Sequence, residues 1–144
     1  MRHYEVRDVM TADPVTVTPA TPIKDLADIL VTRRIEAVPV VTPQGRVTGV
    51  VTEADLLRKE QLKRDPDGSH SRHLPYRDRR AIATAETAGE LMSLHPATVR
   101  AAATAAEAAR LMDLHQVRCL LVTDEGGKLL GVVSPRDLLR VLLS

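Results

Sequence analysis

The sequence predicts an α/β (α+β) fold made of two β-α-β-β-α repeats packed about a pseudo-twofold axis. The main observation is internal repetition at a spacing of 82 residues: GVVTEADLLR at 49–58 matches GVVSPRDLLR at 131–140, with seven of ten residues identical. In each copy, β-branched runs also alternate with an apolar stripe of helical spacing. One copy is too small to bury both faces of its own sheet, so the two copies are expected to pair.

The repetition divides the chain into a first repeat at 1–58, a polar spacer at 59–87 and a second repeat at 88–144. The spacer is rich in Arg, Asp, His and Ser. Its two histidines, His70 and His73, lie in a segment of loop composition, and no Cys or carboxylate cluster completes a site with them, so no metal site is expected. Its basic residues are expected to be solvated or to contact a second copy, with single-stranded nucleic acid as an alternative ligand.

Each repeat is expected to begin with a short strand, at 16–17 and at 98–99. A helix follows in the first repeat, because Thr21 can cap it and Pro22 suits its first position. Its apolar residues recur at helical spacing and form one stripe: Ile23, Leu26, Ala27, Leu30 and Val31.

The corresponding helix of the second repeat begins with a capping box, Thr104 and Glu107. Two hydrophobic runs separated by a glycine-containing turn then predict a β-hairpin in each copy. A closing helix is expected to begin at Thr52 in the first copy and at Ser134 in the second. The apolar face of the second repeat's first helix consists of Ala105, Ala108, Ala109 and Met112.

Composition excludes several functional classes. With two Tyr and neither Phe nor Trp, the chain lacks platforms for stacking bases. A net charge of +1 provides no broad attraction for nucleic acid or a membrane. A single cysteine, Cys119, excludes an intrachain disulfide and, with an N-terminus that lacks an apolar run, predicts a cytoplasmic protein. No nucleophile–base set, P-loop or carboxylate pair is apparent, so no enzyme is expected.

The order VRDVMT, apolar helix, AVPVV, GRVTGVVTEADLL resembles that of a CBS domain, and the second copy resembles it too. Tandem copies resemble a CBS pair, or Bateman module. This resemblance implies a regulatory unit with two clefts between the repeats, no required cofactor, AMP, ADP, ATP or S-adenosylmethionine as candidate ligands, a homodimer formed through helices, and an unidentified regulated protein.

The family's ligand motif, G-h-h-[T/S]-x-x-D (h, hydrophobic), is complete in both copies. Backbone N–H groups at a helix start suit a phosphate, and the hydroxyl can donate to phosphate or ribose oxygens. The carboxylate can accept hydrogen bonds from ribose hydroxyls, and glycine allows a ligand to approach the backbone. The two sets are Gly49, Thr52, Asp55 and Gly131, Ser134, Asp137.

The resemblance further implies that each cleft combines the motif of one repeat with the first strand of the other. The Thr52/Asp55 cleft would gain two guanidiniums, which suit phosphate, whereas the Ser134/Asp137 cleft would gain a carboxylate, which repels it. The sequence therefore predicts asymmetric sites, with aliphatic residues around the adenine. The residues added to the first cleft are Thr98, Arg100 and Arg118; those added to the second are Thr16, Thr18 and Glu36; the aliphatic ones include Val38, Pro39, Leu120 and Leu121.

A purely structural interpretation uses the same atoms. T-x-x-D and S-P-x-D are good helix starts, so both motifs could serve only as caps. Arg100 and Arg118 could be ordinary solvated charges. The alternative function is a structural or protein-interaction dimer with vestigial clefts.

Overall fold

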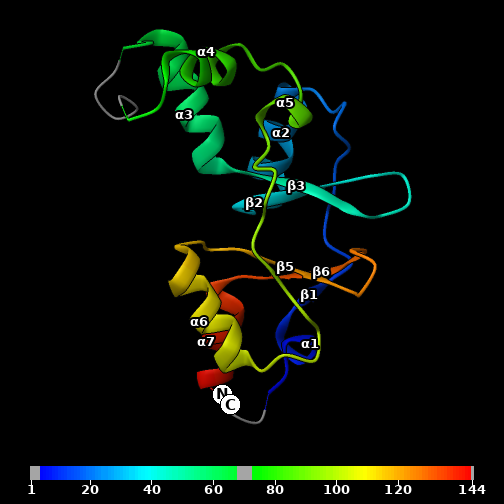
Figure 1. The fold of residues 1–144 in the computed structure, drawn as a ribbon. Helices are drawn as coiled ribbons and strands as arrows, with labels where there is room; N and C mark the ends of the chain where they lie inside the picture. The colour runs from blue at the N-terminus through cyan, green and yellow to red at the C-terminus, as the bar shows by residue number, and fades with distance from the viewer. Residues whose placement is uncertain (1–3, 68–72, 144) are drawn as a thin grey trace. The chain divides into compact units, whose positions relative to one another are not determined.

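The structure is a computed structural model that describes residues 4–67 and 73–143. Helices and strands alternate in a mixed α+β arrangement, as predicted (Figure 1). None of the described helices is both long and apolar enough to cross a membrane. The elements are α1 (Val6–Val9), β1 (Thr11–Ala12), α2 (Ile23–Arg33), β2 (Ala37–Val41), β3 (Val47–Thr52), α3 (Glu53–Arg64), α4 (Tyr76–Thr84), α5 (Ala88–Leu91), β4 (Thr98–Val99), α6 (Ala105–His115), β5 (Leu120–Thr123), β6 (Leu129–Val133) and α7 (Pro135–Leu142).

The chain divides into two compact units that interleave in sequence. The central unit contains Thr16–Val40 and Gly49–Leu94, and the terminal unit contains Met1–Val15, Val41–Thr48 and His95–Ser144. The N-terminal arm of the first sequence repeat thus belongs to the unit that holds most of the second repeat. The start of the second repeat, in turn, belongs to the central unit.

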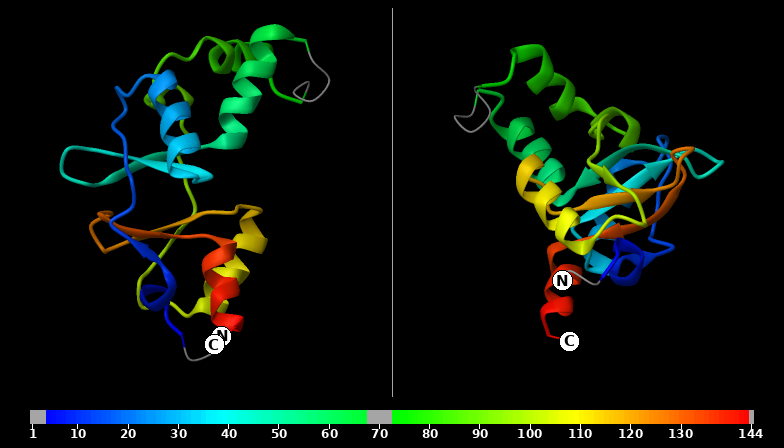
Figure 2. Two further views of the ribbon diagram at one scale, coloured as in Figure 1. Left: turned by 180° about the vertical axis from the view of Figure 1, so that it is seen from behind. Right: turned by 60° about the horizontal axis from the view of Figure 1, so that its bottom comes forward.

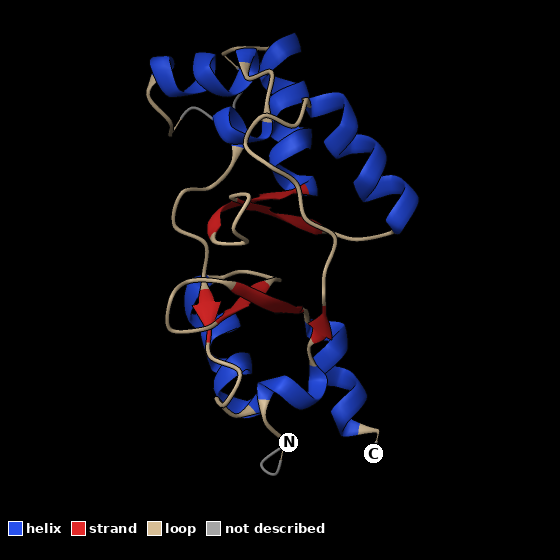
Figure 3. Ribbon diagram, turned by 90° about the vertical axis from the view of Figure 1, so that its right-hand side faces the viewer, coloured by secondary structure: helices blue, strands red, loops and turns tan. Residues whose placement is uncertain are grey.

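The terminal unit is built on a four-stranded sheet in the order β1-β6-β5-β4. β1 and β5 both run antiparallel to β6, and β4 runs parallel to β5. Helices α1, α6 and α7 lie on one side of this sheet (Figures 1 and 3). Their apolar faces enclose an aliphatic core: Val6, Val99, Ala105, Ala108, Met112, Leu120, Val122, Val133 and Leu138.

The central unit packs its helices against the β2–β3 hairpin, on one side of it (Figure 3). The segment that contains α5 is held by backbone bridges, Pro22 with Thr87 and Val50 with Ser93. Helices α3 and α4 lie side by side (Figure 2). The core of this unit is also aliphatic: Val17, Leu26, Leu30, Val38, Val40, Val51 and Ala88.

The start of the first repeat differs from the prediction. Val17 makes only an isolated parallel bridge with Val40, so 16–17 is not a strand. The Thr21 hydroxyl accepts a hydrogen bond from the Thr18 N–H at 3.1 Å instead of capping a helix. The N-cap of α2 is therefore Pro22, without a side-chain bond. The predicted stripe is also too wide, because Val31 is 78% exposed.

Helix α6 matches its prediction more closely. Thr104 caps it by accepting a hydrogen bond from the Glu107 N–H at 3.0 Å. The Glu107 carboxylate does not complete the predicted box; it pairs with Arg110, Oε1 to Nη2, at 2.7 Å. The predicted alanine and methionine face is buried or half-buried.

Much of the segment expected as a spacer is helical. Helix α3 continues to Arg64, and α4 forms at Tyr76–Thr84. His70 lies outside the described residues and His73 is exposed. Among residues 4–67 and 73–143, no three His, Cys, Asp or Glu side chains gather as metal ligands would.

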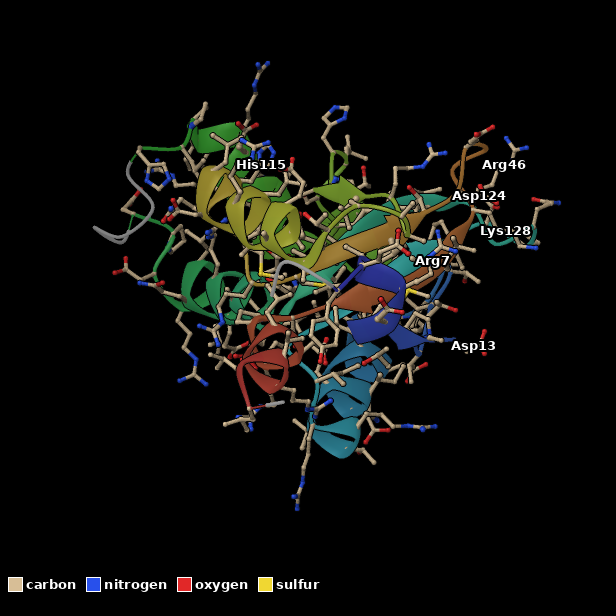
Figure 4. The ribbon with its side chains drawn as sticks, turned by 90° about the horizontal axis from the view of Figure 1, so that it is seen from below. Arg7, Asp13, Arg46, His115, Asp124 and Lys128 are labelled. Carbon is tan, nitrogen blue, oxygen red and sulfur yellow. The ribbon has the colours of Figure 1, made fainter. Side chains whose placement is uncertain are left out.

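Both predicted hairpins form, and their tips contact each other within the terminal unit. Gly45 and Gly127 each close a turn with φ of 83°. The Leu129 N–H donates to the Gly45 carbonyl at 3.0 Å. Arg46 and Lys128 form an isolated antiparallel β-bridge. The Lys128 N–H also donates to Asp124 Oδ1 at 3.0 Å, and Figure 4 labels all three residues.

Candidate functional site

The first motif forms the start of α3 in the central unit. Thr52 and Asp55 make a complete capping box: the Thr52 hydroxyl accepts from the Asp55 N–H at 3.1 Å, and Asp55 Oδ2 accepts from the Thr52 N–H at 2.8 Å. No other residue in the described part of the chain donates to Asp55 Oδ1. One oxygen of this half-buried carboxylate is therefore available to a ligand hydroxyl.

The second motif forms the start of α7 in the terminal unit, and its carboxylate is more fully used. Asp137 Oδ2 accepts from the Ser134 N–H at 2.9 Å and from its hydroxyl at 3.2 Å. Asp137 Oδ1 is 3.5 Å from Arg140 Nη1. Only 7% of the Asp137 side chain is exposed. Both oxygens of this carboxylate are thus occupied by the protein itself.

The two helix starts offer fewer N–H groups to a phosphate than expected. In α3, the Glu53 N–H donates to the Glu36 carbonyl at 2.8 Å, and the Asp55 N–H is used by the cap. In α7, the first residue is Pro135, which has no N–H. A phosphate at either motif would therefore depend on side-chain cations.

The motif glycines are required by the packing of the chain itself. A Cβ on Gly49 would lie 2.6 Å from both the Ser93 carbonyl oxygen and the Met92 sulfur. At Gly131 the corresponding distances are 2.7 Å to the Thr11 carbonyl oxygen and 2.8 Å to the sulfur of Met10. The space where a Cβ would point is filled by a neighbouring segment, so packing alone explains each glycine. The approach of a ligand to the backbone at these glycines stays a prediction.

The residues predicted to complete the clefts are distributed over both units. Arg100 and Arg118 are exposed, and Arg100 makes an ion pair with Glu125 at 3.5 Å, which is solvent-exposed and weak. The predicted combination of Thr52 and Asp55 with these arginines joins residues of different units and stays a prediction. The central unit contains Thr16, Thr18, Val38, Gly49, Thr52 and Asp55; the terminal unit contains Thr98, Arg100, Arg118, Leu120, Gly131, Ser134 and Asp137.

The predicted threonine and aliphatic residues differ in exposure. Thr16, Thr18 and Thr98 are exposed, and the Thr18 hydroxyl is hydrogen-bonded to the Thr21 hydroxyl at 3.4 Å. Val38 and Leu120 have no exposed surface, and each is part of the hydrophobic core of its unit. Their packing role is therefore established, and their proposed contact with adenine is not needed to explain them.

Sequence reasoning missed three residues that contact the motifs. Arg140 neutralises Asp137, and Met10 and Met92 pack against the motif glycines. The spacing of three residues between Asp137 and Arg140 was a signal for the ion pair. It was not sufficient, because Asp55 and Arg58 have the same spacing and make no ion pair in the described structure.

Comparison with known proteins identifies the family. The CBS domain family model matches residues 6–61 and 88–144. The chain is 27% identical over 152 residues to CBSX2, a chloroplastic CBS domain-containing protein of Arabidopsis thaliana, covering 97% of this chain and 64% of that protein. It is 36% identical over 66 residues to inosine-5'-monophosphate dehydrogenase of Korarchaeum cryptofilum, covering 44% of this chain and 14% of the enzyme.

The fold agrees with this family. The crystal structure of CBSX2 in complex with AMP matches with a TM-score of 0.86 and 29% identity, and 97% of each chain is covered. The first matched segment, 6–61, overlaps the first sequence repeat and extends three residues into the predicted spacer, and the second, 88–144, has the bounds of the second repeat. The chain belongs to the CBS domain family and carries two CBS domains in tandem.

Proposed function

We propose that the protein is a regulatory module that binds an adenine nucleotide, or another adenosyl ligand, through Thr52 and Asp55. The observation that carries this proposal is the free Oδ1 of Asp55 at the start of α3, within a complete G-h-h-[T/S]-x-x-D motif. The AMP complex of CBSX2, which is 29% identical over 97% of both chains, supports AMP as the first candidate ligand.

Each residue has a chemical role in this proposal. Asp55 Oδ1 accepts from a ribose hydroxyl, and the Thr52 hydroxyl, whose oxygen already accepts from Asp55, donates its proton to a ligand oxygen. Arg100 and Arg118 supply the charge that the helix start lacks, because guanidinium groups bind phosphate in a bidentate manner. The exposed Arg100–Glu125 pair costs little to break.

The signal is proposed to pass through a homodimer to an unidentified regulated protein. Leu57 on α3 is 71% exposed, and Leu139 at the equivalent position of α7 is 58% exposed. Large exposed apolar side chains on helices favour an interface with another chain. A ligand that binds one arrangement of that interface better than another shifts its population, which is how a non-catalytic module regulates.

Isothermal titration calorimetry of the ligand-free protein with AMP, ADP, ATP and S-adenosylmethionine tests the proposal. We expect at least one of them to bind with a stoichiometry of about one per chain or less, as one competent site requires. Absence of binding by all four would overturn it.

A second candidate is a structural or protein-interaction dimer with vestigial clefts. It is favoured by the capping boxes, which explain Thr52, Ser134 and Asp137 without a ligand. This alternative predicts a dimer that persists when both motif aspartates are replaced, together with no adenosyl ligand at any concentration tested. The calorimetric titration distinguishes the two.

A further inference from the structure

A groove unrelated to the two motifs lies in the central unit, between α3, α4 and the start of α2. Its volume is about 850 Å³, within the range of sites that bind small molecules. Leu62, at its inner side, is 1% exposed, so the groove has an apolar floor. None of its lining residues belongs to the G-h-h-[T/S]-x-x-D motifs.

Positive charge dominates the lining of this groove. Five of its side chains are cationic, and Glu86 is the one acidic residue that lines it in the described chain. The whole protein, in contrast, has a net charge of +1. Such a local excess of cations in a concave surface focuses the electrostatic potential and attracts anions. The cationic residues are Lys24, Lys59, Lys63, Arg79 and Arg80.

Arg79 has an unused donor at this place. Its Nε is buried and has no hydrogen-bond partner in the described structure, although such groups normally have one. Its Nη2 lies 3.9 Å from Asp67, and its guanidinium lies over the Tyr76 ring, 5.8 Å from the centroid. Only 14% of the Arg79 side chain is exposed. The planar guanidinium of Arg79 is thus held in place beside Asp67 and Tyr76, while its Nε donor has no partner in the described structure.

Lys59 is a second recessed cation in the groove. It is 9% exposed, and its Nζ donates to the neutral Ala83 carbonyl at 2.8 Å. Burial lowers its pKa, and repulsion from Lys63 lowers it further, whereas Glu60, Glu86 and Glu90 oppose this decrease. A bound anion would offset the repulsion between Lys59 and Lys63 and favour the charged form of Lys59.

We propose that this groove binds a small molecule that carries two or more phosphate charges. Guanidinium and ammonium groups together are the usual partners of phosphate. The apolar floor and the exposed ring of Tyr76 would contact any organic part of the ligand. A small molecule fits better than a nucleic acid, because the cations surround one recessed space and the groove has one aromatic ring.

The test is calorimetry of the full chain with inorganic tripolyphosphate at physiological ionic strength. Two double variants have the same change in charge on the same two helices. Lys63→Glu with Arg80→Glu reverses groove residues, whereas Arg64→Glu with Arg77→Glu reverses neighbours that do not line the groove. Arg64 and Arg77 are largely exposed, with 81% and 91% of their side chains accessible.

We expect the groove variant to weaken tripolyphosphate binding at least about tenfold and the neighbouring variant to weaken it by less than about threefold. Arg100→Ala with Arg118→Ala, which removes the two cations proposed to bind phosphate at the adenosyl site, should leave tripolyphosphate binding unchanged, and loss of binding in that variant would place the probe at the adenosyl site instead.

Three outcomes would overturn the proposal. Tripolyphosphate fails to bind the wild-type chain; the two double variants weaken it equally, which indicates general charge attraction; or a single-stranded oligonucleotide binds through the same residues more tightly, which indicates a macromolecular ligand. Circular dichroism of every variant establishes that a loss of binding is not a loss of fold.

Discussion

Arg140 lies against Asp137, with Nη1 3.5 Å from Oδ1, whereas Arg58 at the equivalent position makes no ion pair with Asp55 in the described structure. The ion pair occupies the one oxygen of Asp137 that the helix cap leaves free. The two copies of a motif that is complete in both repeats are therefore chemically unequal. The asymmetry predicted from the sequence rested on different residues, Arg100 and Arg118 against Glu36, and stays a prediction.

Asp55→Ala is expected to abolish AMP binding, and Asp137→Ala to leave it nearly unchanged, because only Asp55 has a free acceptor. Each substitution removes a capping interaction and should lower the free energy of unfolding by about 1 kcal/mol. Calorimetry and urea denaturation measure the two effects separately. Loss of binding in Asp137→Ala alone would contradict the assignment.

Gly49→Ala and Gly131→Ala are both expected to destabilise the protein by about 1–3 kcal/mol, because the new Cβ would contact a backbone carbonyl oxygen at 2.6 and 2.7 Å. The measurement is the free energy of unfolding from urea denaturation. Gly126→Ala is a control, since its nearest contact would be 3.5 Å from an Asp124 side-chain oxygen. Equal stability of all three variants would show that the neighbouring segments move away at no cost.

Gly127→Ala tests the turn between β5 and β6. The residue has φ of 83°, and a Cβ there would meet nothing within 4 Å. The loss of stability on substitution by alanine therefore comes only from the backbone conformation. We expect a loss of about 1–2 kcal/mol in the free energy of unfolding. Gly127→Asn should lose less, because Asn tolerates the left-handed region. If Asn and Ala cost the same, the conformational explanation is wrong.

Lys59→Met tests a pH dependence. Burial and Lys63 lower the pKa of Lys59 below its ordinary value of 10.5. Between the folded and unfolded pKa values the unfolded chain binds more protons, so the contribution of Lys59 to stability rises with pH through that interval. The wild type should therefore gain stability relative to Lys59→Met as the pH rises from the folded pKa toward the ordinary value of 10.5. A constant difference across this range argues against a lowered pKa.

Leu57→Glu with Leu139→Glu tests the proposed dimer. The two leucines are exposed at equivalent positions of α3 and α7, so glutamate should not affect folding but should oppose burial in an interface. Light scattering after gel filtration is expected to show a dimer for the wild type and a monomer for the variant. A wild-type monomer, or a variant that stays dimeric, would remove these leucines from the interface.

The sequence was sufficient for the mixed α+β fold, both hairpins and the helix starts at Thr52 and Ser134, because these depend on turn residues and caps that act locally. It failed at Thr21, whose hydroxyl is used by the Thr18 N–H, and at Val31, whose exposure depends on which helix face packs against the hairpin. The sequence also could not predict the ion pair between Asp137 and Arg140, since Asp55 and Arg58 are the same two residue types at the same spacing and do not pair in the described structure.

The interleaving of the two units has a consequence for biosynthesis. Thr11 of β1 pairs with Val132 of β6, so β1 finds its partner only after the long segment between them has been made. Contacts between residues so distant in sequence form slowly. The duplicated segments are therefore not independent folding units. Two fragments produced by a cut between the repeats should regain structure only when they are mixed, because each fragment supplies a segment that the unit of the other fragment requires.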